Sequence, residues 1–259
     1  MFKIDLKVIL FTLLVGVLII CSVVLAVLYF IIYPASIMKG NGVTTSEKRN
    51  LTKFSKIIIG DKITINITQA TSDENVEVKA EDNIIKQIKT EVSGDTLYIN
   101  FARQSIFGLQ TIDPSKEVIV NLNYKDLTDI SISGSVILQS TNKVRVDKLN
   151  LNQSGSTVST LDLFSNSLNV NMSATSTATI TGSAASQEVN VSGSIKYVAN
   201  NLDSKNVKVS VSGDGNVKVR ADESLDMNVS GAGSIEYSGS PKKLTQNISG
   251  TGTVKQTNN

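Results

Sequence analysis

Seven short segments of the sequence place an asparagine or serine two positions before a second serine, and each segment ends at a glycine or an alanine. The first column consists of Ser131, Asn152, Asn171, Asn190, Ser210, Asn228 and Asn247, and the second of Ser133, Ser154, Ser173, Ser192, Ser212, Ser230 and Ser249. Amides and hydroxyls donate and accept hydrogen bonds without carrying a charge. If the segments lie side by side, these side chains could bind one another or the hydroxyl groups of a sugar. We take the five asparagines as the candidate binding ladder.

Acidic residues also fall on the outward face, where they could do acid–base chemistry. Asp129, Glu188 and Asp226 share one column, which is interrupted by Asn150, Asn169, Lys208 and Thr245. Glycoside hydrolysis requires two carboxylates that converge on one bond. No two successive segments carry acids in this column, so a solvated face is expected. Asp214 and Asn216 lack the further acidic ligands of a calcium loop. The sequence predicts no catalytic, cofactor-binding or metal-binding residue and no enzyme.

Composition supports this prediction. The chain has no histidine and no tryptophan, and its one cysteine, Cys21, lies in an apolar N-terminal run. It therefore lacks the commonest general base and metal ligand, and it cannot form an intramolecular disulfide. The 25 basic and 23 acidic residues are interspersed. No basic stripe with interleaved aromatics is present, which argues against a nucleic-acid partner.

The seven segments define an internal repeat. Their final positions are Gly134, Gly155, Ala174, Gly193, Gly213, Gly231 and Gly250, so successive spacings are 21, 19, 19, 20, 18 and 19 residues. Each copy alternates apolar and polar residues with a period of two, which indicates a β-strand, and the glycine permits a tight corner. A unit this small must stack on its neighbours to bury a core. The sequence thus predicts an all-β, parallel β-helix or solenoid-like ectodomain with coils of about 19 residues over 128–256. A leucine-rich repeat has a similar period but needs a different consensus.

The preceding region, residues 51–127, is also rich in alternating segments but does not follow the same register. We interpret it as an N-terminal β region that caps the open end of the stack. Residues 34–50 contain several glycine, serine, threonine and asparagine residues and read as a linker.

The apolar run covers residues 8–33 and contains 26 residues without a charge. As a helix it would be about 39 Å long, which is enough to cross a hydrocarbon core of about 30 Å. A cleaved signal peptide would have a shorter apolar region and a small-residue cleavage site. We therefore expect one transmembrane helix whose partner is the lipid bilayer. Lys3 and Lys7 favour a cytoplasmic tail over residues 1–7, while Lys39, Lys48 and Arg49 favour the reverse. Because the tail is short and the remainder is rich in serine, threonine and asparagine, we expect the large domain to lie outside the cell membrane.

The Ser-Gly-x-Gly corners at 212–215, 230–233 and 249–252, together with Phe54, Ile57 and the segment YSGSP at 237–241, make the sequence resemble the bacterial head GIN domain family. Members of that family are described as auto-transporter adhesins. The resemblance covers about residues 51–256 and implies a right-handed β-helical or similar solenoid at the bacterial surface, with no catalytic residues to transfer. Copies two to four depart from the pattern, since they lack the second glycine and Ala174 replaces a glycine, which predicts corners that are looser or differently turned.

Two functions remain open at this point. The first is a non-enzymatic surface module that uses its polar ladder for adhesion, or to present itself to a glycan or protein ligand. The alternative is a cell-envelope sensor or scaffold that acts through lateral contacts of its helix. End-to-end self-association is a further possibility, because the chain ends in the uncapped polar segment TVKQTNN.

Overall fold

The computed structural model describes residues 6–32, 37–102 and 111–257, and within the N-terminal helix it describes the side chains of residues 13–27. The chain divides into two compact units, Met1–Lys39 with Arg103–Asp113, and Gly40–Ala102 with Pro114–Asn259. The first unit contains helix α1 (Leu6–Ile32) and strands β1 (Ile37–Lys39) and β8 (Thr111–Asp113), which pair in parallel. Among the described residues, no helix combines the length and apolar character that a membrane span requires. The predicted span 8–33 ends at Tyr33, which lies outside the described residues.

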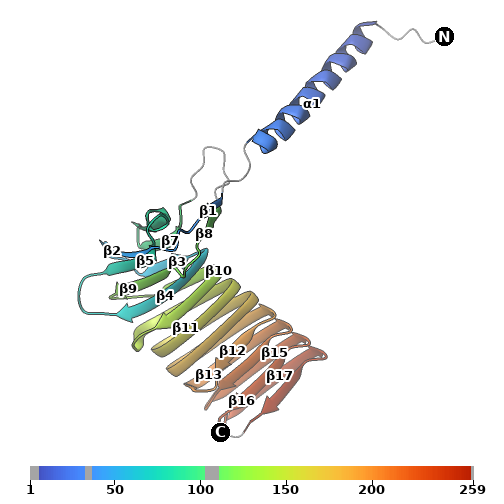
Figure 1. Cartoon of the computed structure of the whole chain (residues 1–259). Coiled ribbons are helices and arrows are strands. Elements are labelled where there is room, and N and C mark those ends of the chain that lie inside the picture. The colour runs from blue at the N-terminus through green and yellow to red at the C-terminus, as the bar shows by residue number, and fades with distance from the viewer. Residues whose placement is uncertain (1–5, 33–36, 103–110, 258–259) are drawn as a thin grey trace, which may run out of the picture. The chain divides into compact units, whose positions relative to one another are not determined.

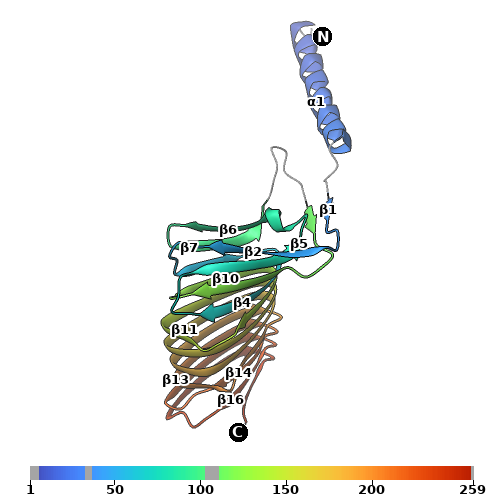
Figure 2. The ribbon, with the colours of Figure 1, turned by 60° about the vertical axis from the view of Figure 1, so that its left-hand side comes forward.

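The second unit consists mainly of two ladders of parallel strands that share β10 (Asp129–Ser140) and β11 (Val144–Gly193) (Figure 1). In the first ladder, β10 pairs with β3 (Lys56–Ile59), which pairs with β7 (Thr96–Phe101). From β11 the same ladder continues through β13 (Leu202–Gly213), β15 (Ser224–Gly231) and β17 (Lys243–Gly250). In the second ladder, β10 pairs with β4 (Lys62–Gln69), which pairs with β9 (Ile119–Tyr124). From β11 this ladder continues through β12 (Lys196–Ala199), β14 (Asn216–Arg220), β16 (Ser234–Ser238) and β18 (Thr253–Gln256). Figure 2 shows these strands lying layer upon layer.

The strand registers align equivalent positions of successive repeats. Gly134 pairs with Gly155, and Gly231 pairs with both Gly213 and Gly250. Parallel pairing in this register stacks each corner on the preceding one and each apolar position on its equivalent. The repeats are therefore neither antiparallel hairpins nor segments of a helical fold.

Apolar side chains of consecutive layers meet in one interior. The buried residues at the alternating apolar positions of the repeat are Ile130, Ile132, Leu149, Leu151, Leu168, Val170, Met172, Val189, Val191, Val207, Val209, Val211, Leu225, Met227 and Val229. The last copy differs, because Leu244 and Ile248 are 46% and 41% exposed. Strand β17 pairs only with β15 in the described chain, so its inward face has no further layer to cover it.

The polar residues Gln187 and Ser204 are also buried in this interior. The Gln187 amide donates to the Ser204 hydroxyl at 2.9 Å, and the Tyr197 hydroxyl donates to Gln187 Oε1 at 3.1 Å. Burial raises the pKa of Tyr197 well above its ordinary value of 10.0, because the phenolate would lose its hydration. This glutamine is retained in the core because its hydrogen bonds are made inside the core.

The corners depend on a positive φ. Gly193 has φ 107°, and Ala174, which replaces glycine, has φ 64° and forms the same corner. The left-handed corner is thus kept where an alanine replaces the glycine. Asp61, with φ 66°, occupies the equivalent corner next to Gly134.

The N-terminal end of the unit is closed by antiparallel strands. Strand β5 (Asn75–Glu81) pairs with β9, and β2 (Thr44–Asn50) pairs along its whole length with β5. A single 3-10 turn (Ile85–Gln87) leads into β6 (Ile88–Ser93), which pairs antiparallel with β7. The range 34–50, expected to be a linker, thus contains the strands β1 and β2. The sequence TTSEKRN is polar on both faces, so it carries no alternation from which a strand could be predicted.

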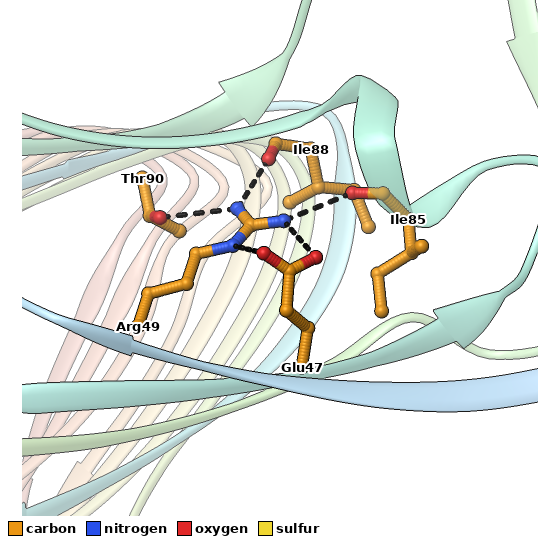
Figure 3. Close-up of polar contacts among 5 residues, drawn as sticks. All are labelled: Glu47, Arg49, Ile85, Ile88 and Thr90. Carbon is orange, nitrogen blue, oxygen red and sulfur yellow. Dashed lines mark hydrogen bonds and ion pairs between the residues drawn. The ribbon is translucent and has the colours of Figure 1, made fainter.

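Arg49 attaches β2 to the turn (Figure 3). Its guanidinium donates to the carbonyl oxygens of Ile88 at 2.6 Å and Ile85 at 3.1 Å, and to the Thr90 hydroxyl at 3.1 Å. The same group forms two hydrogen bonds to the Glu47 carboxylate, at 3.0 and 3.1 Å. A planar guanidinium with several donors suits this convergence of acceptors.

The buried carboxylate of Glu81 joins β5 to two neighbouring loops at the N-terminal end of the unit. Glu81 is 1% exposed, and it accepts hydrogen bonds from the Gly42 amide at 2.5 Å, the Ser115 hydroxyl at 2.5 Å and the Ser115 amide at 2.9 Å. The Ser115 hydroxyl makes the largest contribution to lowering the pKa of Glu81 below its ordinary value of 4.5. The Gly42, Lys116 and Ser115 amides add to the effect, and burial opposes it.

Candidate functional site

The predicted ladder of asparagines lies on the outward face of the ladder that contains β10, β11, β13, β15 and β17. Asn171 Nδ2 donates to Asn152 Oδ1 at 2.9 Å, and Asn190 Nδ2 donates to Asn171 Oδ1 at 3.2 Å. Asn152 in turn donates to the Ser131 hydroxyl at 3.4 Å. Three of the five predicted asparagines are thus joined in one hydrogen-bonded row.

The remaining two asparagines belong to the same column. Ser210 pairs with Asn190 on one side and Asn228 on the other, and Asn228 pairs with Asn247. Serine has no side-chain amide, so Ser210 interrupts the row of hydrogen bonds between asparagine side chains from Asn190 to Asn228. The structure therefore aligns all five predicted residues.

A groove of about 760 Å³ runs along this column. It is lined by the asparagine and serine column and by the serine column next to the corner, together with Ile58, Ile132, Gln153, Met172, Val191, Val211 and Val229. None of these lining residues is charged. The groove is thus a neutral, elongated surface that offers mainly hydrogen-bonding side chains, with the exposed Ile58 as an apolar contact at one end.

Alternation along each strand positions the lining side chains. Val191 is buried, and its neighbours Asn190 and Ser192 are directed to the opposite face. Near the corner, the Ser173 hydroxyl donates to the Gln153 carbonyl at 3.4 Å, which links adjacent layers. Packing of the core therefore fixes the direction of the two polar columns.

The acidic column beside the groove does not form an acid–base pair. Asp129 accepts a hydrogen bond from Asn150 at 2.8 Å, and Glu188 forms an ion pair with Lys208 at 3.1 Å. Asp226 lies next to Lys208 and Thr245 in the register. The described carboxylates of this column are separated by other residues, as the sequence predicted.

Sequence reasoning missed Ile58, which lines the groove and is 42% exposed. It pairs with Ser131 and so extends the asparagine column toward the N-terminal end. The available signal was the segment KIIIGDK, which aligns with DISISGS of the next layer if Asp61 takes the corner position. The absence of the Ser-Gly pair hid this further copy of the repeat.

Two solved structures are similar to the chain in both sequence and fold. A "putative adhesin" from Bacteroides fragilis NCTC 9343 is 25% identical with a TM-score of 0.79, and the match covers 85% of this chain and 100% of that one. A "putative adhesin" from Parabacteroides distasonis ATCC 8503 is 25% identical with a TM-score of 0.69 and coverages of 86% and 100%.

A "putative lipid binding protein" from Parabacteroides distasonis ATCC 8503 is 18% identical with a TM-score of 0.71 and coverages of 86% and 100%, and this likeness concerns the fold alone. No curated protein matches the sequence. The family model described as "Putative auto-transporter adhesin, head GIN domain" matches residues 53–241, which is more than half of the chain. The chain therefore belongs to the head GIN domain family.

Proposed function

We propose that this protein is a non-enzymatic, membrane-anchored surface module, in which a β-solenoid of about 19-residue coils presents the groove to a partner outside the bacterial cell. The observation that carries the proposal is the groove of about 760 Å³, whose two polar columns extend over seven copies of the repeat. A continuous surface of this kind can bind an extended partner by many weak contacts. Membership of an adhesin-type family supports a location at the cell surface.

The parallel registers support the solenoid. Equivalent glycines pair from one copy to the next, and the apolar positions between them pool into one core. Neighbouring layers in such a stack are about 4.8 Å apart. The surface is therefore rigid and regular, as a presenting scaffold requires.

The sequence supports the membrane anchor. Residues 8–33 carry no charge, and the helix α1 covers most of this range. The bilayer is the partner of this segment in our proposal, with the short tail in the cytoplasm and the large domain outside. Lys3 and Lys7 before the run agree with this orientation.

The pattern of charges supports a binding role without catalysis. Glu188 is neutralised by Lys208, and Asp129 is hydrogen-bonded to Asn150. The groove itself is lined by uncharged residues, so it contains no group that could act as a general acid or base at neutral pH.

The proposal is tested with the full chain expressed in a bacterial membrane. A membrane-impermeant amine reagent should label the lysines of the large domain in intact cells. Cells that carry the protein should also adhere to a surface coated with bacterial cell walls. Replacing Ser173 and Ser192 by tryptophan would fill the groove from outside the core, and we expect this change to abolish adhesion. Adhesion that persists in the filled variant would contradict the proposal.

Replacing α1 by an unrelated apolar helix distinguishes this function from a sensor. A surface module tolerates the exchange, because the helix serves only as an anchor. A sensor that acts through lateral contacts of its helix would lose its function, while the groove would still bind.

A further inference from the structure

The asparagine column continues past Ile58 to an aromatic residue. Ser131 pairs with Ile58, and Ile58 pairs with Tyr98 of β7. Ile58 is 42% exposed and Tyr98 is 38% exposed, so both present apolar surface to the solvent at this end of the column. The aromatic ring of Tyr98 offers an apolar face on which a flat group could pack at this end.

The amide row retains hydrogen-bonding capacity for a ligand. An asparagine amide has two N–H donors and two acceptor lone pairs. Asn171 uses one donor toward Asn152 and one acceptor toward Asn190. One donor and one acceptor remain on this residue, and the groove lies directly over them. Each such layer can therefore both donate to and accept from a bound group.

The groove also selects by charge. Its described lining residues are all uncharged, and Lys208 of the flanking column is already paired with Glu188 at 3.1 Å. A charged ligand would lose hydration on entering the groove without gaining an opposite charge. The complementary ligand is therefore neutral.

The spacing of the layers argues against a peptide. Strand-like peptides direct every second residue to the same side, which repeats at about 6.6 to 6.8 Å, whereas the layers repeat at about 4.8 Å. A peptide therefore falls out of step with the amides after two layers. In an extended β-1,4-linked glycan successive rings are turned over, so equivalent hydroxyl groups face the column once for about every two layers, and these groups both donate and accept.

Resting on the proposed function, we infer that the ligand of the groove is an uncharged linear glycan. The glycan lies along the column, its hydroxyl groups bind the free amide and serine positions, and one end ring packs on Tyr98 and Ile58. From Tyr98 to Asn247 the column contains eight steps between paired residues. At about 4.8 Å a step, the column is about 38 Å long.

The test uses the full chain in detergent and measures its affinity for chitin and cellulose oligomers of two to about eight rings, the length that the column can hold. We expect affinity to rise with each added ring. The same measurement is made with a polygalacturonate oligomer of equal length and with a neutral peptide. The neutral glycans should bind best.

Two variants and two matched controls locate the ligand. Tyr98→Ala removes the ring at the end of the column, and Asn171→Ala removes one amide of the row. Each should weaken binding by about 3- to 10-fold, corresponding to the loss of a stacking contact or a hydrogen bond.

The control for Tyr98 is Phe164, which is 52% exposed and lies outside the column that runs from Tyr98 through Ile58 to the asparagines. The control for Asn171 is Asn169, on the same strand, which donates to Asn150 at 3.0 Å but lies outside the groove. Phe164→Ala and Asn169→Ala should leave binding unchanged. All four positions are outward, and circular dichroism verifies that the variants fold.

Failure of this inference differs from failure of the proposed function. If the filled groove abolishes adhesion but the oligomers do not bind, or the peptide or the polyuronate binds better, the glycan is wrong and the surface role remains. Oligomer binding that Tyr98→Ala and Asn171→Ala leave unchanged also overturns the inference. If adhesion survives in the filled variant, the proposed function itself is wrong.

Discussion

Ala174 lies next to Gly193 at the corner of adjacent layers, and its carbonyl oxygen is 2.7 Å from the position that a Cβ on Gly193 would occupy. Backbone contact at this distance leaves no space for a side chain. The corner thus imposes two requirements on Gly193, a positive φ of 107° and the absence of a Cβ.

The first prediction concerns these corners. Ala174→Gly should stabilise the protein by about 0.5 to 1 kcal/mol, because glycine relieves the left-handed strain of about 1 to 2 kcal/mol but adds entropy to the unfolded chain. Gly193→Ala should destabilise it by more than about 2 kcal/mol, since strain and overlap add. Urea unfolding of the full chain measures both changes. Equal effects of the two substitutions would show that the corner conformation is not imposed by the stack.

The second prediction concerns Arg49. Arg49→Ala should lower the free energy of unfolding by about 2 to 3 kcal/mol, because the Ile85 and Ile88 carbonyls lose a charged donor. Lys48→Ala on the same strand is the control and should change stability by less than about 0.5 kcal/mol. Hydrogen exchange should show faster exchange of β6 amides in Arg49→Ala alone. If Lys48→Ala has the same effect, the bonds in Figure 3 do not secure the turn.

The third prediction concerns acid stability. The pKa of Glu81 is lowered in the folded protein, so its contribution to stability is complete above the unfolded value of 4.5 and is lost as the pH falls through the folded value. Glu81→Gln should be less stable at pH 7, and its stability should change less below pH 4.5.

Denaturant unfolding at a series of pH values measures this difference, with Glu223→Gln as a control on an exposed carboxylate. Parallel pH profiles for the wild type and Glu81→Gln would exclude the carboxylate as the source of the acid sensitivity.

The fourth prediction concerns the open end. Strands β17 and β18 each have one neighbour in the described chain, and Lys243 and Lys255 are exposed on them. Edge lysines oppose strand pairing between molecules. Replacing both by valine should increase end-to-end association over the exposed Leu244 and Ile248, and light scattering should show a mass that rises with concentration. Lys196→Val, on the inner strand β12, should not change the mass.

The sequence predicted the parallel stacking of the repeats because both required signals are local. Alternation assigns Val189 and Val191 to the core, and the recurrence of Ser-Gly fixes the register of the layers. The alignment of Asn152, Asn171 and Asn190 follows from the same two signals, so the ladder could be predicted residue by residue. Its use as a binding site stays a prediction.

Other features were not predictable because they depend on partners distant in the chain. Strand β2 has no apolar face. It forms because it pairs with the edge of β5 and because Arg49 donates hydrogen bonds to the 3-10 turn. Ala174 has no intrinsic preference for a positive φ, and its neighbours impose that conformation. The burial of Leu244 and Ile248 was expected from their pattern, but burial requires a further layer that the described chain does not supply.

Each repeat forms one layer of the stack, so the length of the groove is set by the number of repeats. Inserting a complete unit would lengthen the polar columns by one asparagine and one serine, about 4.8 Å, without altering any corner. A chain of this design can match partners of different length by gaining or losing whole units, while the chemistry of each layer stays the same.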